Sequence, residues 1–211
     1  MGQTKIRSLQ TTMPNADGWM LVLDTWTYAS VTTITVPSGA ALLYAVGDKI
    51  RLKQGAGYKY FYVIVVADTL LTVTGGSDYT VATPTAITDV YYSHATSPVG
   101  FPNIFSFTPV ITAGSGTFTT VVGSITFSIV GKLVGMTISI SITTNGTAAT
   151  FVSSTLPFNA SQSYLWPSRE TQLTGSLGQV VVQNDANFFT INNAYPGGDN
   201  YTLIASGIYI I

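Results

Sequence analysis

Few residues of this sequence have the types and spacing that acid–base chemistry requires. The single histidine, His94, and the single glutamate, Glu170, are the first candidates. A Ser-His-Asp site would have to use His94, but the sequence has no nucleophile-elbow pattern, so we interpret His94 as a loop or interface residue. Glu170 and Asp185 could form a glycosidase pair, but their spacing does not support it. The sequence therefore predicts a protein that is not an enzyme and uses no cofactor.

A short basic row is the second candidate. Lys49, Arg51 and Lys53 alternate with two aliphatic residues, so a strand would place the three cations on one face. That face could contact phosphates, but a solvated face or a polar contact to a neighbouring subunit is the favoured interpretation. The formal net charge of −1 also disfavours long-range attraction to nucleic acid or to an anionic membrane.

Metal binding is not expected either. The sequence has no cysteine, which excludes disulfides and thiolate metal sites. Two loops, 184–187 and 197–200, are rich in side-chain oxygens, but neither has a recognisable calcium-binding spacing. We therefore predict no metal site.

A saccharide-contact loop is the remaining candidate. The segment 161–170 contains Tyr164, Trp166 and Arg169, and two further tyrosines, Tyr195 and Tyr201, lie near turns later in the chain. Aromatic rings can stack on sugar faces, and a guanidinium can fix sugar hydroxyls. Packing in the core or at an interface between subunits or domains is the favoured alternative, because Trp and Arg are also enriched at protein interfaces.

The elements that would position these residues are strands. From Ile125 to Ile142, apolar and polar residues alternate on both sides of Gly131-Lys132, which predicts an antiparallel hairpin with a tight turn. Asn145-Gly146 predicts the next turn, and residues 150–158 a further short strand. No segment shows a helical period, so the fold is expected to be all-β.

The chain divides into four predicted parts. Residues 1–17 are interpreted as an N-terminal arm or attachment segment, and residues 18–98, with about six short strands, as a small β-barrel or roll. Residues 99–108, which contain three phenylalanines and Pro102 and are flanked by Pro98 and Pro109, are expected to be an ordered linker. Residues 109–211 are expected to form a β-sandwich.

The composition is typical of proteins that function in assemblies. Hydrophobic residues make up 46% of the chain and charged residues 8%, against about 25% charged residues in an average soluble protein. As a monomer such a chain would expose sizeable apolar patches, which a three-fold axis could bury. The sequence shows neither a signal peptide nor a membrane-spanning segment, so we expect synthesis in a cytoplasm and no membrane insertion.

Two sets of motifs carry a resemblance to a known family. The first set comprises Asp17-Gly18-Trp19, Trp26-Thr27-Tyr28, Gly47-Asp48-Lys49-Ile50, Tyr60-Phe61-Tyr62, residues 72–79 and Gly100-Phe101-Pro102. It resembles the small β-domain found upstream in many tail-fibre-like proteins of tailed bacteriophages. The second set comprises Gly131-Lys132, residues 154–157, Gly178-Gln179 and residues 194–198. It resembles the jelly-roll head domains of such fibres, which are similar to the C1q and tumour-necrosis-factor fold.

The resemblance, which covers about residues 17–211, implies a function as well as a fold. It implies a virion structural protein, a short homotrimeric tail fibre or spike that is assembled in the host cytoplasm. Its N-terminal region would contact the tail, baseplate or capsid, and its head would bind a host-surface glycan or receptor. No collagen-like or coiled-coil shaft separates the two parts, so the appendage would be stubby. The alternatives are a capsid-attached head fibre or decoration protein and, less favoured, a capsule depolymerase.

Overall fold

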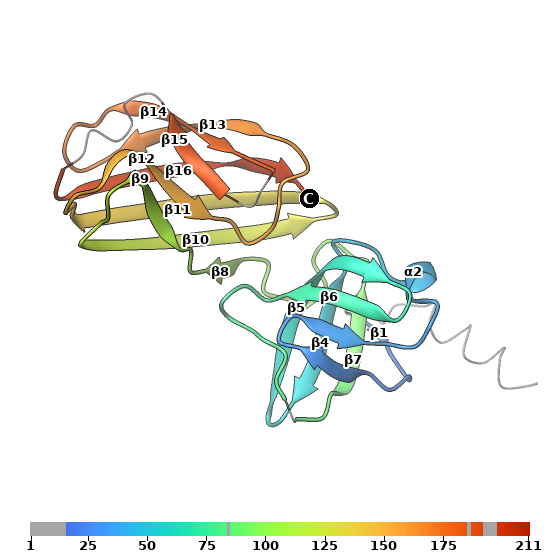
Figure 1. Cartoon of the computed structure of the whole chain (residues 1–211). Helices are drawn as coiled ribbons and strands as arrows, with labels where there is room; N and C mark the ends of the chain where they lie inside the picture. The colour runs from blue at the N-terminus through green and yellow to red at the C-terminus, as the bar shows by residue number, and fades with distance from the viewer. Residues whose placement is uncertain (1–15, 84, 185–186, 192–197) are drawn as a thin grey trace, which may run out of the picture. The chain divides into compact units, whose positions relative to one another are not determined.

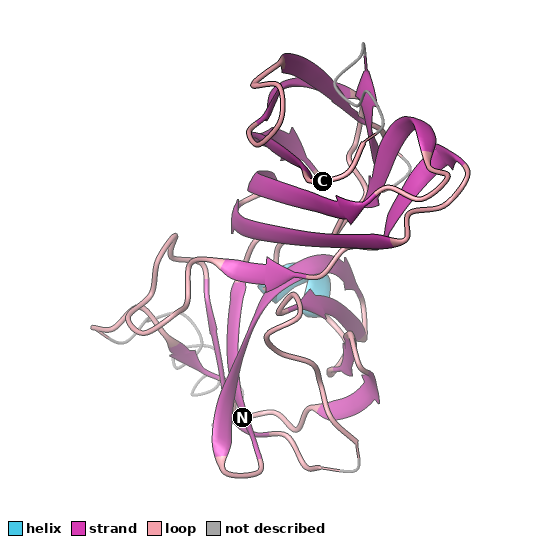
Figure 2. Cartoon of the chain, turned by 90° about the vertical axis from the view of Figure 1, so that its left-hand side faces the viewer, coloured by secondary structure: helices cyan, strands magenta, loops and turns pink. Residues whose placement is uncertain are grey.

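The computed structural model describes residues 16–83, 85–184, 187–191 and 198–211 of the chain (Figure 1). The described residues form two compact units, the first ending at Asn103 and the second beginning at Ile104; residues 129–132 are grouped with the first. Strands and loops make up both units, with a single short helix among the described residues (Figure 2). All the strand pairings described are antiparallel, so the prediction of an all-β protein is confirmed. The predicted arm, residues 1–17, lies almost entirely outside the described residues.

The first unit is built on a seven-stranded sheet with the order β1-β7-β4-β5-β6-β3-β2. The strands are β1 (Met20–Leu21), β2 (Thr27–Ser30), β3 (Thr33–Thr35), β4 (Lys49–Gln54), β5 (Gly57–Ala67), β6 (Leu70–Thr74) and β7 (Thr88–Ser93), and the helix is α2 (Ala40–Leu43). Strand β5 is long enough to pair with β4 at one end and β6 at the other, and its register shifts between Val63 and Val65. Such a bulge bends a strand, which lets the sheet curve around an aromatic and aliphatic core.

The second unit is built on a nine-stranded sheet with the order β8-β10-β11-β16-β13-β14-β15-β12-β9. Its strands are β8 (Phe105–Phe107), β9 (Ile111–Ser115), β10 (Thr120–Val130), β11 (Leu133–Thr144), β12 (Ala149–Thr155), β13 (Tyr164–Glu170), β14 (Leu177–Val182), β15 (Asn187–Ile191) and β16 (Tyr201–Ile210). The predicted hairpin is present as β10 and β11, and Gly131 in its turn has a φ of 59°, a conformation that favours glycine.

The sheet of the second unit depends on pairing between strands distant in sequence as well as on hairpins. Strand β11 pairs with the last strand, β16, over ten residues, from Leu133 with Ile210 to Ile142 with Tyr201. Figure 1 shows β10, β11 and β16 along one side of this unit and β12 to β15 along the other. The inward side chains of the alternating strands are buried between them, among them Phe127, Ile138 and Val180. Each of these strands therefore has one face in the core and one face outward.

The segment expected to be a linker, residues 99–108, divides between the two units. Its first part belongs to the first unit, because the Trp19 indole donates a hydrogen bond to the Val99 carbonyl at 2.9 Å and the Val99 N–H donates to the Asp17 carbonyl at 2.9 Å. Its second part contains β8, which pairs with β10 in the second unit. The segment is thus ordered on both sides of the boundary between Asn103 and Ile104.

Candidate interaction surface

Trp166, the central residue of the expected saccharide loop, lies in the core of the second unit. Strand β13 alternates, and Trp166 points inward with 5% of its surface exposed. Its indole N–H donates a hydrogen bond to the Ile208 carbonyl at 3.2 Å, and its ring packs against Tyr209 with centroids 6.1 Å apart. The ring therefore presents no face to a sugar, and core packing, the favoured alternative, describes this residue.

Three of the other four expected saccharide residues lie within the described residues, and they differ in exposure. Tyr201 is buried, and the Tyr164 hydroxyl accepts a hydrogen bond from the Ile210 N–H at 3.1 Å. Arg169 is exposed on the outward face of β13. Tyr195 lies outside the described residues, so its role stays a prediction. Among the members of the expected saccharide set that the structure describes, Trp166 included, only Arg169 is exposed and available to an external partner.

The packing of Trp166 gives a testable prediction at Gly207. A Cβ on Gly207 would overlap the indole ring of Trp166, whereas a Cβ on Gly198 of the same unit would meet only the Leu173 Cδ1 at 3.9 Å. We expect Gly207→Ala to lower the free energy of unfolding by about 1–3 kcal/mol, because overpacking forces a shift of backbone or ring. Gly198→Ala is the control, with an expected effect under about 1 kcal/mol. Urea unfolding followed by circular dichroism measures both, and equal effects would contradict the prediction.

Glu170 organises a loop. Its carboxylate is 1% exposed and accepts hydrogen bonds from the backbone N–H groups of residues 172–175 at 2.5–3.1 Å and from that of Thr202 at 3.3 Å. Burial raises the pKa of this carboxyl, but the hydrogen bonds from residues 172–175 lower it by more, and the net pKa lies far below its usual range. A general acid needs a raised pKa, so this site does not suit proton donation. Asp185, the other half of the considered pair, lies outside the described residues.

His94 makes a polar contact with a buried carboxyl group in the first unit. Its Nδ1 lies 2.8 Å from Oδ1 of Asp48, a buried carboxylate whose other oxygen accepts a hydrogen bond from the Ala45 N–H at 2.7 Å. The imidazole also packs edge-on against Tyr92, with centroids 5.3 Å apart. This arrangement anchors the residue after β7 to the turn before β4.

The basic row on β4 is covered rather than solvated, which corrects the sequence-based interpretation. Lys49 is 3% exposed, and this burial lowers its pKa. The Arg51 guanidinium lies over three rings, those of Trp19 at 4.8 Å, Tyr91 at 4.2 Å and Tyr58 at 5.3 Å. Aromatic residues on β5, β7 and the segment before β1 thus cover most of the row. Lys53 is the most available of the three cations, and it lies 3.9 Å from Asp89.

A surface with a different character lies on the outside of the second unit. Cross-strand partners share a face of a sheet, so the pairs Ser139–Ile204, Ile204–Arg169 and Arg169–Leu177 place one row of side chains across β11, β16, β13 and β14. Alternation extends this outer face to residues 133, 135, 137, 139 and 141 of β11, 202, 204, 206, 208 and 210 of β16, 165, 167 and 169 of β13, and 177, 179 and 181 of β14.

The outer face is aliphatic and hydroxyl-rich, and Arg169 is its one charged residue. Several large side chains on it are exposed to solvent: Leu133, Leu165, Leu177, Ile204 and Ile208. Isolated exposed aliphatic residues are normal on a protein surface, but a contiguous group on adjacent strands indicates an interaction surface. These residues alternate with the buried ones, so each lies on the outward face of its strand. The pairing of β16 with both β11 and β13 brings them together.

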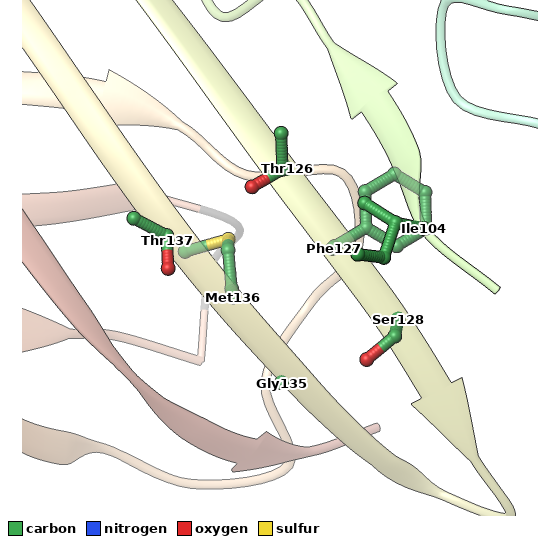
Figure 3. A pocket seen from close by; sticks show the side chains of 7 residues that line it. All are labelled: Ile104, Thr126, Phe127, Ser128, Gly135, Met136 and Thr137. Carbon is green, nitrogen blue, oxygen red and sulfur yellow. The ribbon is translucent and has the colours of Figure 1, made fainter.

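A hollow of about 190 Å³ lies beside this face, over β10 and β11 (Figure 3). Figure 3 shows Thr126 and Ser128 on one strand, Gly135 and Thr137 on the next, and Ile104 at the side. Phe127 and Met136 point into the core beneath it. The hollow exists because Gly135 has no side chain between the hydroxyl groups of its neighbours.

The described residues contain no group of three or more His, Cys, Asp or Glu side chains that could hold a metal ion. Within the same residues, no helix has the length and apolar character needed to cross a membrane. Comparisons with protein-family models, with curated proteins and with solved structures found no match to this chain.

Proposed function

We propose that this chain is a structural protein that works as a homotrimer, a short fibre or spike of a tailed-phage virion. The second unit would be its jelly-roll-like head, and the N-terminal region would join it to other virion proteins. The observation that carries the proposal is the outer face of β11, β16, β13 and β14, with its exposed aliphatic side chains and a single charge. The phage assignment itself rests on the motif resemblance.

The low charge of the outer face favours a second copy of the chain as its partner. A three-fold axis brings copies of the same residue together close to the axis, and like charges in contact there are costly. A face whose one charge is Arg169 avoids most of that cost. Burial of its leucine and isoleucine side chains would contribute roughly 25 cal/mol for each Å² of apolar surface removed from water. Self-association therefore suits this surface better than binding to a charged partner.

Glycan binding is less well supported than assembly. The rings of Trp166 and Tyr201 are buried, which leaves Arg169 as the exposed member of the expected set among the described residues. We therefore place the function of the second unit first in assembly, and a host-surface ligand would have to use residues other than Trp166 and Tyr201.

The native mass of the full chain tests the proposal. Light scattering after size exclusion should give a value near three times the 22.4 kDa chain mass at micromolar concentration. A monomer at all concentrations up to about 100 μM, where weak complexes still form, would overturn the homotrimer. Gold-labelled antibodies against the chain would test the virion assignment on purified particles. Labelled tails or baseplates are expected, whereas labelled capsids would favour a head fibre or decoration protein.

A further inference from the structure

We propose that the copies of this homotrimer meet through two unlike parts of one surface, a ridge and a hollow. The ridge consists of Leu165, Ile204 and Ile208 on β13 and β16, and the hollow is the one over Gly135 on β10 and β11. The inference rests on the proposed homotrimer and adds which residues make its contact. The ridge of each copy enters the hollow of the next.

The ridge is exposed, aliphatic and supported by the sheet. Leu165, Ile204 and Ile208 expose 58%, 40% and 59% of their surface, although they lie on strands in the middle of the nine-stranded order. Strand β16 pairs with β11 along residues 201–210 and with β13 at residues 203–205, so the outward side chains of Ile204 and Ile208 project from a paired backbone. A rigid row of branched aliphatic residues loses little conformational entropy on binding and so suits a specific contact.

The hollow has the size and chemistry to accept such a side chain. Its volume is about 190 Å³, its rim is formed by the hydroxyl-bearing residues Thr126, Ser128 and Thr137, and Ile104 is exposed beside it. No charged or titratable residue lines it, and none of its lining side chains has a buried polar atom without a partner. An ionic ligand would find no opposite charge there, whereas an aliphatic side chain would displace water from an uncharged hollow.

The arrangement of the two parts fits a ring of copies. Every contact in a three-fold ring joins two different patches, so each copy must carry both. Ile208 is the cross-strand partner of Gly135, so the ridge and the hollow lie side by side on one continuous sheet. The sheet fixes their spacing, which means that the same surface can donate a ridge to one neighbour and offer a hollow to the other.

A charge-swap experiment on the full chain tests this contact. Ile208→Glu places an acid on the ridge and Thr137→Lys a base in the hollow; both positions are exposed, so the second unit should still fold. We expect each single variant to weaken association by about 100-fold or more, since an unpaired charge would be buried in the contact. The double variant should recover the trimer, because every contact then pairs Lys with Glu. Leu42→Glu, at a residue of α2 that is 90% exposed, is the control and should stay trimeric.

Light scattering gives the mass of each variant, and circular dichroism shows that it is folded. If the wild-type chain is trimeric and either single variant stays trimeric, the ridge-and-hollow contact is wrong while the homotrimer stands. If both single variants dissociate and the double variant does not recover, the two residues do not face each other and the pairing is wrong. A monomeric wild-type chain would instead reject the proposed function itself.

Discussion

Replacement of Glu170 by glutamine is expected to lower the free energy of unfolding of the second unit by about 2–3 kcal/mol. The carboxylate accepts hydrogen bonds from four consecutive backbone N–H groups and from the Thr174 hydroxyl. An amide offers one acceptor oxygen and a nitrogen that can only donate, so several of these N–H groups would lose their partner. The loss is kept to a few kcal/mol because residues 171–175 are themselves exposed and water can reach them once the loop opens.

Asp199→Asn is the matched control for this replacement. Asp199 is exposed, and its Oδ1 accepts a hydrogen bond from the Asn145 N–H at 2.7 Å, which the amide oxygen of asparagine can still accept. Urea unfolding should therefore separate the two carboxylate-to-amide changes, with an effect under about 0.5 kcal/mol for Asp199→Asn. A Glu170→Gln variant as stable as the wild type would show that the loop does not depend on the negative charge.

The stabilisation by Glu170 should also depend on pH. Its pKa is depressed in the folded state, so its contribution is fully present above the unfolded-state pKa of about 4.3 and is lost as the pH falls toward the folded-state pKa. The difference in stability between the wild type and Glu170→Gln should therefore be constant from about pH 5 upward and shrink below it. Unfolding curves at pH 3, 4, 5 and 7 would measure it, and a pH-independent difference would contradict the assignment.

The period of two in the sequence correctly predicted the hairpin of β10 and β11, because alternation directly reports one buried face. It could not identify the outer face, which depends on long-range pairing of β16 with β11 and β13. The segment around Trp166 was expected to be irregular, yet residues 164–170 form β13. Pro167 has no N–H to donate; the described pairing of β13 with β16 begins at the next residue, Ser168, whereas the pairing with β14 runs through Pro167.

Two further differences have simple causes. The helix α2 has four residues, too few for a period to be visible, and begins after Gly39 with a φ of 91°. The alternation of Lys49 and Arg51 with Ile50 predicts that the two cations lie on a solvated face of β4. In the structure, aromatic residues distant in sequence cover that face. For Glu170 the only local signal is that a lone glutamate ends a strand before Gly175, whose φ is 65°.

That aromatic cover gives the second large expected effect, at Phe101. We expect Phe101→Ala to destabilise the first unit by about 3–4 kcal/mol, within the range for removal of a buried phenylalanine. The ring is buried and lies against three others, those of Trp19, Tyr60 and Tyr62, with centroids 6.1, 6.0 and 5.0 Å away. Its removal would leave a cavity between the sheet and the segment that covers it.

Val99→Ala is the matched control, because the Val99 side chain is exposed while its backbone makes both hydrogen bonds to Asp17 and Trp19. This change keeps those backbone bonds and should cost less than about 0.5 kcal/mol. Tryptophan emission during urea unfolding is a suitable measurement, since Trp19 and Trp26 are both buried in the first unit. If the two variants unfold at the same urea concentration, residues 99–103 do not stabilise the first unit. If only Phe101→Ala is destabilised, these residues belong to that unit's core and are not a free connection to the second.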